Sequence, residues 1–432
     1  MKLPSISFLY TLYQQHPQIQ TDTRKLKLGD LYFALKGPNF NGNLFALSAI
    51  ENGASFAIVD EPIEHSDTLN DRILEVEDVL STLQALAKHH REQFTIPFIG
   101  ITGSNGKTTT KELVYAVLAS HFKTYTTQGN YNNHIGVPLT LLSIKADAQM
   151  AVIEMGANHL NEIASYCTYA MPNYGLITNC GKAHLEGFGS EEGVKKGKGV
   201  LYDYLRNHNG TAFVMSDFEY LLKMSTGLSE VISYGNNTGN LQASASTVNG
   251  FLNVNFTKGS PIQTIQTQLV GEYNLPNILA AVSIGLYFKV PADKIKTAIE
   301  NYAPSNSRSQ LLKWKGNDVI LDAYNANPSS MQLAIENFSK LSAAHKIVCI
   351  GGMKELGNTS LAEHQALITL LENHKWEQVI LVGGDFENCQ HHYTYFHNAL
   401  EAKEWLKAKA FVHRTILIKG SRGIRMEQVL ED

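Results

Sequence analysis

The chain has 432 residues, of which 44% are hydrophobic, and a formal net charge of -4. At roughly 150 residues per domain, this length predicts about three domains with apolar cores. The weak negative charge gives no basic face or stripe for nucleic acid, so we expect no nucleic-acid partner. No run reaches the roughly 18 apolar residues of a membrane span, and the N-terminal segment makes a poor signal peptide. We therefore expect a cytoplasmic protein without membrane insertion.

The four cysteines stand at positions 167, 180, 349 and 389, without a C-x-x-C pair. This spacing fits structural thiols in a reducing cytosol better than a disulfide framework. We interpret them as small buried residues.

The first stretch of the chain, residues 1–90, predicts a small α/β domain. Short β-type runs at 31–35 and 55–60 are separated by a turn-rich segment at 36–43. A helical pattern over 78–94 closes the stretch.

The second stretch begins with an apolar strand pattern, "IPFIGIT", followed by a glycine loop and an amphipathic helix. Apolar runs at 150–155 and 174–179 predict buried parallel strands. Residues 233–274 alternate and are rich in turn residues, which predicts a small antiparallel sheet. Helical patterns return over 277–288 and 293–302.

The third stretch follows a Pro/Ser/Asn linker at 303–310 and predicts a second doubly wound parallel α/β unit. Four strand candidates alternate with helices. They cover 318–324, 346–352, 378–384 and 415–421. In the helix at 327–341 Pro328 stands near the start, and an apolar stripe at helical spacing is explained by core packing.

The segment "FIGITGSNGKTTT" (98–110) is a candidate phosphate loop. Position 101 is isoleucine, where the common G-x-x-x-x-G-K-[ST] spacing needs glycine. A loop between a buried strand and a helix N-terminus nevertheless presents backbone N–H groups and the positive end of the helix dipole. Gly103 and Gly106 permit unusual backbone conformations, Lys107 can reach outer phosphates, and Thr108 can ligate magnesium. We predict nucleotide binding over the alternative of a purely structural turn, since strand, glycines, Gly-Lys-Thr and helix fall in register.

Metal ligands for a triphosphate are expected at the carboxyl ends of neighbouring strands. Glu154 ends the apolar run at 150–155, and His184 lies in the loop after the run at 174–179. A carboxylate at such a place is about as often a cap as a ligand, and most of the 16 histidines must be bystanders. From the pattern alone both residues remain candidates.

Further motifs accompany the loop in a fixed order. They are "TDTRKLKLGDLYFALKG", "NYNNHIGVPLTLL", "VIEMGANHLNEI", "HLEGFGSEEGVKKGKG", "GEYNLPNILAAVSIG", "DAYNANPSSM" and "KGSRGIRME". With "GITGSNGKTT" (100–109), which fits the form G-x-x-G-x-[NG]-G-K-[ST]-[ST], they resemble the Mur ligase family of bacterial peptidoglycan synthesis. The resemblance covers nearly the whole chain and is nearest to the members that add D-alanyl-D-alanine.

The resemblance implies an α/β fold of three domains. These are a small uridine-nucleotide (UDP-substrate) domain at 1–90, a central parallel-sheet ATP-binding domain at 91–304, and a C-terminal Rossmann-like domain at 305–432.

The resemblance also implies roles for individual residues. Lys107 and Thr108 would hold the β- and γ-phosphates and a first magnesium ion, with Glu154 in the same metal region. His184 would ligate a second magnesium ion, and Lys198 would be carbamylated; a solvated lysine run is the alternative at 195, 196 and 198. The ATP site would comprise Gly103, Ser104, Asn105, Gly106, Lys107, Thr108, Thr109, Asn277, Arg308 and Asp322. The catalytic set would be Lys107, Glu154, His184, Lys198 and Arg308, the metal set Thr108, Glu154, His184 and Lys198, and the substrate contacts Thr23, Arg24, Asn130, Asn132, Asn133 and Asn325.

The sequence departs from the family pattern at three places. Tyr273 stands where the family often has histidine, no acidic residue follows Lys198 closely, and "FNGNLF" (40–45) replaces an aspartate-glycine-histidine run. These departures bear on the adenine motif, the modified lysine and the uridine-nucleotide contacts.

The implied activity is ATP-dependent ligation of D-alanyl-D-alanine to UDP-N-acetylmuramoyl-tripeptide through an acyl phosphate. ATP and two Mg²⁺ ions would serve a monomeric enzyme of peptidoglycan precursor synthesis, and so of cell-wall formation, cell shape and division. The alternatives are another amino-acid-adding Mur ligase, a folylpolyglutamate synthase, a nucleotide-gated binding protein and a kinase. The "DAYNANPSSM" segment favours the dipeptide-adding type, because a diaminopimelate-adding ligase would show an aspartate-asparagine-proline-arginine motif.

Overall fold

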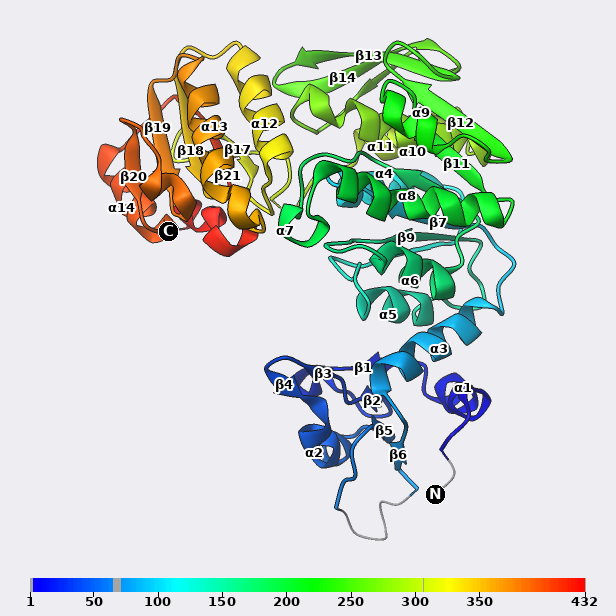
Figure 1. Ribbon diagram of the computed structural model, residues 1–432. Helices are drawn as coiled ribbons and strands as arrows, with labels where there is room; N and C mark the ends of the chain where they lie inside the picture. The colour runs from blue at the N-terminus through cyan, green and yellow to red at the C-terminus, as the bar shows by residue number, and fades with distance from the viewer. Residues whose placement is uncertain (1–2, 65–70, 306, 432) are drawn as a thin grey trace. The chain divides into compact units, whose positions relative to one another are not determined.

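The computed structural model describes residues 3–64, 71–305 and 307–431 of the chain (Figure 1). Among these residues the strands form sheets of four, nine, six and two strands, so the predicted α/β class is confirmed. The chain divides into two compact units. The first comprises Met1–Gly100, Phe122–Gly156 and Glu162–Tyr174, and the second comprises Ile101–His121, Ala157–Asn161 and Gly175–Asp432.

The N-terminal part of the first unit is built on a four-stranded parallel sheet of order β1-β2-β5-β6. Its strands are β1 (Ile19–Gln20), β2 (Leu31–Phe33), β5 (Phe56–Val59) and β6 (Ile73–Glu75), with α1 (Ile6–Gln15), α2 (Ala46–Glu51) and the hairpin β3 (Lys36–Gly37) and β4 (Phe40–Asn41) beside them. α3 (Val79–Arg91) begins where the Asp78 carboxylate accepts the Ser81 N–H at 2.7 Å. Both predicted strands and the closing helix are confirmed.

The remainder of the first unit supplies two strands and two helices. They are β8 (Thr124–Thr126), β9 (Met150–Glu154), α5 (Gly136–Leu142) and α6 (Glu162–Ala170). β8 pairs in parallel with β9, with Thr124 opposite Met150. All five residues of β9 are buried, as predicted for a strand covered on both faces.

The nine-stranded sheet has the order β15-β14-β13-β12-β11-β10-β7-β9-β8. Its other elements are β7 (Phe98–Thr102), α4 (Lys107–Ala119), β10 (Tyr174–Ile177), α7 (Leu185–Phe188), α8 (Glu191–Asn207), β11 (Thr211–Met215), α9 (Glu219–Met224), β12 (Glu230–Gly235), β13 (Leu241–Val248), β14 (Phe251–Lys258), β15 (Thr264–Gln266), α10 (Leu275–Tyr287) and α11 (Ala292–Glu300). The apolar face predicted for α4 is fully buried, at Leu113, Val114, Val117 and Leu118. Gly285 of α10 allows close approach of the two helices, because a Cβ there would lie 2.6 Å from Cγ1 of Val117.

Residues 233–274 do not form a separate sheet, so that prediction was wrong in part. β13, β14 and β15 are antiparallel, with Val248 opposite Phe251 at the hairpin. β12 joins them in parallel to the large sheet through Tyr234 and Leu241. The alternating pattern gave the strands correctly, but it carries no information on which neighbour an edge strand pairs with.

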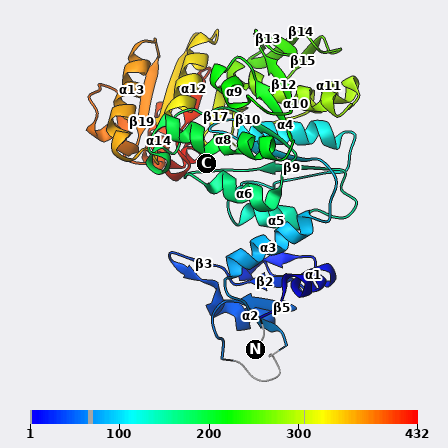
Figure 2. The same ribbon diagram turned by 45° about the vertical axis from the view of Figure 1, so that its right-hand side comes forward.

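The C-terminal sheet has the order β16-β17-β21-β18-β19-β20, in which only β16 is antiparallel to its neighbour. Its strands are β16 (Gln310–Trp314), β17 (Asn317–Asp322), β18 (Lys346–Gly351), β19 (Gln378–Val382), β20 (Thr394–Phe396) and β21 (Thr415–Lys419). One face packs against α12 (Pro328–Lys340) and α13 (Ser360–Glu372), which lie side by side (Figure 2). The opposite face packs against α14 (Ala399–Lys409) and the C-terminal turn η8 (Met426–Leu430). Helices on both faces of a mostly parallel sheet confirm the predicted doubly wound unit.

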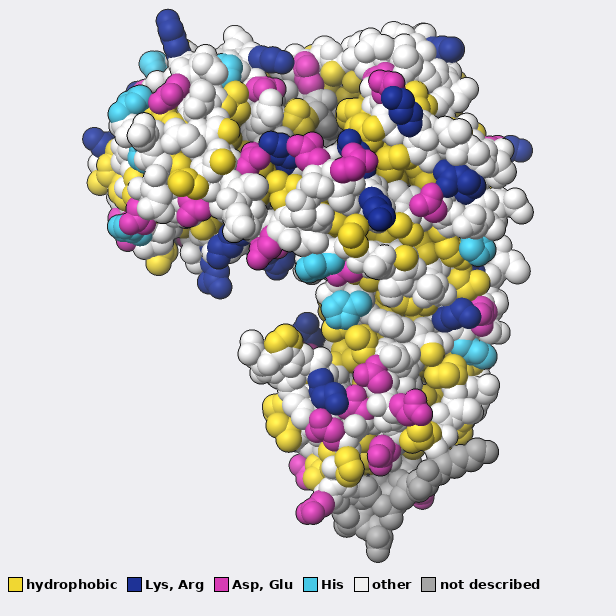
Figure 3. All heavy atoms as spheres, in the orientation of Figure 1, with side chains coloured by type: hydrophobic (Ala, Val, Ile, Leu, Met, Phe, Trp, Pro, Cys, Tyr) yellow, Lys and Arg dark blue, Asp and Glu magenta, His cyan; other side chains and the backbone are white. Residues whose placement is uncertain are grey.

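The surface and the cysteines bear on the other compositional predictions. Acidic and basic side chains are interspersed on the face shown in Figure 3. No helix in the described ranges is both long and apolar enough to cross a membrane. The thiols of Cys167, Cys180 and Cys349 are buried and Cys389 is partly buried. Burial raises the pKa of Cys167 and Cys349 to about 12, so these thiols stay protonated at neutral pH.

Candidate active site

The phosphate loop lies between β7 and the first turn of α4, as predicted. Gly103 and Gly106 have φ angles of +148° and +78°, in the region that favours glycine. Their surroundings also require glycine, because a Cβ on Gly103 would overlap Oγ1 of Thr178, and one on Gly106 would lie 2.6 Å from Oδ1 of Asn277. The two glycines therefore hold the loop in a backbone conformation closed to other residues, at a helix N-terminus, which is where anions commonly bind.

The segment after β10 holds the phosphate loop from one side. Ser104 donates its N–H to Asn179 O at 2.8 Å and its hydroxyl to Gly181 O at 2.9 Å. Thr178 Oγ1 donates to Asn105 O at 2.6 Å, and Asn179 Oδ1 accepts the Asn105 N–H at 3.1 Å. Sequence analysis did not single out Thr178 or Asn179. Their position after a neighbouring apolar strand was the available signal.

Lys107 and the threonines that follow it occupy the first turn of α4. Lys107 Nζ donates to the carbonyl oxygens of Gly103 at 2.7 Å and Ser104 at 3.1 Å, so its ammonium group lies against the loop. Thr108 and Thr109 are buried, with 6% and 7% of their surface exposed. An ammonium group against a glycine cradle fits the outer phosphates of a nucleotide.

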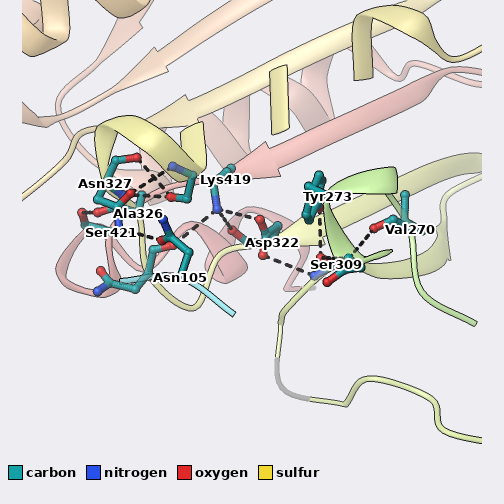
Figure 4. Close-up of polar contacts among 12 residues, drawn as sticks. Asn105, Val270, Tyr273, Ser309, Asp322, Ala326, Asn327, Lys419 and Ser421 are labelled. Carbon is teal, nitrogen blue, oxygen red and sulfur yellow. Dashed lines mark hydrogen bonds and ion pairs between the residues drawn. The ribbon is translucent and has the colours of Figure 1, made fainter. Parts of the chain in front are cut away.

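Asn277, predicted to contact adenine, belongs to a hydrogen-bonded chain. Thr110 Oγ1 donates to Asn277 Oδ1 at 3.0 Å, and Asn277 Nδ2 donates to Asn274 Oδ1 at 2.9 Å. Tyr273, which replaces the family's usual histidine, lies with its hydroxyl 2.9 Å from Ser309 Oγ (Figure 4). Burial is the main cause that raises the pKa of Tyr273, so its hydroxyl stays neutral. Tyr273 thus makes a polar contact to the linker before β16.

Asp322, at the end of β17, forms a buried ion pair that sequence analysis missed. Lys419 Nζ lies 2.6 Å from Asp322 Oδ2, with side-chain exposures of 2% and 15% (Figure 4). Asp322 Oδ1 also accepts the Ser309 N–H at 3.2 Å. Lys419 Nζ further contacts the carbonyl oxygen of Asn325 at 3.4 Å, so the predicted substrate residue lies beside this pair with its side chain exposed. The signal in the sequence that could have indicated this ion pair is the lysine that ends the apolar strand "TILIK".

A hydrogen bond joins the C-terminal part of this unit to the phosphate loop. Asn327 Nδ2 donates to Asn105 Oδ1 at 2.8 Å (Figure 4), while Asn327 Oδ1 accepts the Ser330 N–H and caps α12. Ser329 Oγ accepts the Lys182 N–H at 2.9 Å. The "DAYNANPSSM" segment therefore contacts the phosphate loop through Asn327 and the segment after β10 through Ser329.

Arg308 lies over the ring of Tyr324. Its Cζ atom is 3.4 Å from the centroid of the Tyr324 ring, and Arg422 Nη1 donates to the Tyr324 hydroxyl at 2.9 Å. The flanking Ser307 and Ser309 have positive φ angles of 55° and 48°. Two guanidinium groups gathered on one tyrosine form a basic cluster suited to an anionic ligand.

His184 lies in the loop after β10, at the start of α7, with a φ of 52°. Its Nδ1 lies 2.5 Å from Oε2 of Glu355. The His184 contact is the main cause that lowers the pKa of the Glu355 carboxyl, with a smaller contribution from the charge of Lys107. His184, Glu355 and Lys107 therefore belong to one electrostatic cluster, and Glu355 was missed by sequence analysis.

Lys198 lies on α8 and its side chain is fully buried. Its Nζ is 5.2 Å from the ring centroid of Phe188. Lys196 is exposed and Lys195 is 3.1 Å from Glu192. The alternative of a solvated lysine run thus holds for Lys196 but is wrong for Lys198, because the Lys198 side chain is buried. A lysine is almost never fully buried without a specific environment.

Glu154 ends β9 in the first unit and is fully buried. Asn132 Nδ2 donates to Glu154 Oε1 at 2.7 Å, so a predicted metal ligand and a predicted substrate residue are in contact. Asn133 Oδ1 accepts the N–H groups of Ile135 and Gly136 just before and at the start of α5, while Asn130 is exposed. Within the described ranges no cluster of three or more His, Cys, Asp or Glu side chains could hold a metal by itself. Mg²⁺ does not need such a cage, since it is usually bound by one or two carboxylates together with phosphates and water.

Thr23 and Arg24 lie in a short 3₁₀ turn of the first unit. The Arg24 guanidinium is 87% exposed and 2.8 Å from Asp22, and this contact is the main cause that lowers the pKa of Asp22 to about 2. Their roles in substrate binding stay predictions.

Comparison with known proteins gives one family along the chain. The Mur ligase middle-domain model matches residues 101–285, the Mur ligase glutamate ligase domain model matches 307–422, and the Mur ligase family catalytic-domain model matches 17–91. The UDP-N-acetylmuramoyl-tripeptide–D-alanyl-D-alanine ligase of Bacillus subtilis is 32% identical to this chain over 431 residues, which cover 96% of this chain and 92% of the relative. The ligase of the same name from Escherichia coli is also 32% identical, over 95% of this chain and 92% of the relative. The MurF ligase of Thermotoga maritima, solved in complex with ADP, is 27% identical with a TM-score of 0.87 and covers 96% of this chain and 97% of its own.

Proposed function

Because the chain belongs to the Mur ligase family, we propose that it joins D-alanyl-D-alanine to UDP-N-acetylmuramoyl-tripeptide at the expense of ATP. The products are the pentapeptide precursor of peptidoglycan, ADP and phosphate. The observation that carries the proposal is the glycine loop at 103–106, with the Lys107 ammonium group against it. The chain is also similar, along 96% of its length, to the Bacillus subtilis ligase that carries the name of this reaction.

The chemistry requires activation, because a carboxylate does not react with an amine at neutral pH. An oxygen of the tripeptide's terminal carboxylate attacks the γ-phosphorus of ATP, ADP leaves, and an acyl phosphate forms. The amine of D-alanyl-D-alanine then attacks the acyl carbon, loses a proton, and phosphate leaves as the amide bond forms. Lys107 and Arg308 stabilise the charge of the transferring phosphoryl group, and holding the reactants in one site supplies much of the rate. Exclusion of water protects the acyl phosphate from hydrolysis.

Two Mg²⁺ ions are part of the proposal, with Thr108, Glu154, His184 and carbamylated Lys198 as their protein ligands. Magnesium bound to phosphate oxygens would neutralise the charge that develops there. Reaction of the Lys198 amine with carbon dioxide would replace a cation by a carboxylate, which is a ligand that magnesium prefers. The complete burial of Lys198, next to an exposed Lys196 on the same helix, supports its special role.

Substitution of Lys198 tests the modified lysine. Lys198→Ala is expected to abolish ligation, and a short carboxylic acid such as acetate is expected to restore it in part, because it can take the place of the lost carboxylate. Lys196→Ala, on the exposed face of α8, is the matched control and should keep full activity. Ordinary activity of Lys198→Ala, measured by phosphate release, would refute the assignment.

Reconstitution tests the reaction itself. The purified protein is incubated with ATP, Mg²⁺, UDP-N-acetylmuramoyl-tripeptide and D-alanyl-D-alanine, and the products are examined by mass spectrometry. The proposal requires an increase equal to the dipeptide less water, with one phosphate released per product. A single added amino acid would favour another Mur ligase, glutamate added to a folate would favour a folylpolyglutamate synthase, a phosphorylated product without an amide would favour a kinase, and no turnover would favour a nucleotide-gated binding protein.

We also propose three structural and cellular assignments. The domains are a UDP-substrate domain at 1–90, an ATP-binding domain at 91–304 and a C-terminal domain at 305–432. The enzyme acts as a monomer, since one chain carries every residue assigned to the site. It acts in the cytoplasm, where ATP is supplied, and so contributes to cell shape and division.

A further inference from the structure

Glu355 lies in the loop between β18 and α13 and contacts the start of α7 in two ways. Its carboxylate lies 2.5 Å from His184 Nδ1, and its carbonyl oxygen accepts the Glu186 N–H at 3.3 Å. The side chain and the main chain of one residue thus hold the segment that carries His184.

Both residues of this contact have backbone conformations that side chains normally avoid. The φ angle is 52° at His184 and 64° at Glu355. A non-glycine residue in the left-handed region costs on the order of 1 to 3 kcal/mol and persists only where its surroundings enforce it. Such residues cluster at functional sites, so the pair is not explained as an ordinary surface contact.

We infer that Glu355 is a positioning residue for His184. A carboxylate beside Nδ1 favours the tautomer with its proton on that nitrogen, which leaves the lone pair of Nε2 available as a ligand. The inference rests on the proposed role of His184 toward Mg²⁺. It adds that the ligand is oriented by a residue of the C-terminal domain.

An ion pair in the same unit provides a matched control. Lys182 Nζ lies 2.8 Å from Glu363 Oε1, and these residues also belong to the loop after β10 and to α13. Loss of Glu363 therefore removes an ion pair between the same two parts of the unit without removing the His184 contact. Glu355→Ala and Glu363→Ala separate orientation of His184 from simple tethering.

The test measures metal binding without turnover. Mn²⁺ is titrated into the full-length protein with saturating ADP, and free Mn²⁺ is followed by electron paramagnetic resonance. Loss of a residue that orients a metal ligand typically weakens binding by roughly 10- to 100-fold. Glu355→Ala is expected to weaken Mn²⁺ binding by about tenfold or more. Glu355→Gln should be intermediate because its amide oxygen can still accept the Nδ1 proton, and Glu363→Ala should bind as the wild type does.

The double variant His184→Ala/Glu355→Ala decides whether Glu355 acts through His184. Positioning requires that it bind Mn²⁺ as His184→Ala alone does. Additive losses, an equal loss in Glu363→Ala, or unchanged binding in Glu355→Ala would each overturn the inference. Unchanged binding in His184→Ala would instead refute the metal role of His184 itself. Thermal unfolding of each variant shows whether it is folded. If Glu355→Ala does not fold, Glu355→Gln takes its place in the test.

Discussion

Lys419 and Asp322 show how one buried pair can fix a site residue in place. Asp322 is assigned to the ATP site, yet both of its carboxylate oxygens already have partners in Lys419 and the Ser309 N–H. The carboxylate is therefore held in one orientation at the end of β17. Desolvation makes such a pair costly to form and still more costly to break, because the remaining charge stays buried.

Lys419→Met is expected to lower the free energy of unfolding by about 3 kcal/mol, since it leaves the Asp322 carboxylate without its cation. The control is Lys313→Met, which removes a 2.5 Å contact to Asp318 in the same sheet, where the side chains are 79% and 45% exposed. Exposed pairs contribute less than about 1 kcal/mol, so this variant should be almost as stable as the wild type. Urea unfolding of both variants makes the comparison. Equal stability of Lys419→Met and Lys313→Met would show that burial does not strengthen the first pair.

The residues that sequence analysis found differ in kind from those it missed. Gly103, Gly106 and Lys107 belong to one short segment between a strand and a helix, so the local sequence predicted the cradle although position 101 departs from the common spacing. Lys419 pairs with a residue 97 positions earlier, and Glu355 with one in another loop. Such partners are brought together by the fold, and a single lysine or glutamate carries no pattern that identifies its contact.

The strand, loop and helix of the phosphate cradle act as one element. Gly106 forms the N-cap of α4 with a left-handed backbone, and the side chain of Asn277 fills the space beside it. The loop therefore depends on α10 as well as on its own glycines.

Gly106→Ala should weaken ATP binding by roughly tenfold or more, because 1.4 kcal/mol changes a binding constant tenfold and displacement of Asn277 adds to the backbone strain. Gly316→Ala is the control. Gly316 has the same φ of 78°, but a Cβ there would be 3.8 Å from its nearest neighbour, an ordinary contact. Both variants carry a left-handed residue that costs about 1 to 2 kcal/mol, and only the first crowds the cradle. Calorimetric titration with an ATP analogue measures the affinities, and equal affinities would show that the Asn277 contact is unimportant.

Element patterns predicted most of the fold, but not how every strand pairs. The continuous apolar runs at β9, β10, β18, β19 and β21 gave buried parallel strands, because helices cover both faces. The alternating pattern at 233–274 predicted the strands β13 to β15 but not their attachment to the large sheet. That attachment depends on the parallel pairing of β12 with β13, in which Tyr234 lies opposite Leu241, and side-chain alternation does not encode such pairing.

At the scale of the whole molecule, each compact unit contains, among its described residues, one buried histidine that is held neutral. In the first unit His90 Nε2 donates to Ile144 O at 2.8 Å. In the second unit His364 Nδ1 donates to Ser360 O at 2.7 Å, and its Nε2 accepts the Met353 N–H at 3.0 Å. Burial is the main cause that lowers the pKa of both histidines. A proton added to His364 Nε2 would face the Met353 N–H and have no acceptor.

This arrangement predicts that the protein loses stability in mild acid. A histidine whose pKa is lower in the folded state binds more protons when unfolded, so stability is complete above the unfolded pKa of about 6.5 and falls as pH decreases below it. Trp314, Trp376 and Trp405 all lie in the second unit, so tryptophan fluorescence during urea unfolding reports on the surroundings of His364. The free energy of unfolding should be lower at pH 5.5 than at pH 7.5. His364→Gln should reduce this difference, whereas His392→Gln, at an exposed position, should not. The same pH dependence in wild type and His364→Gln would show that other groups cause the loss.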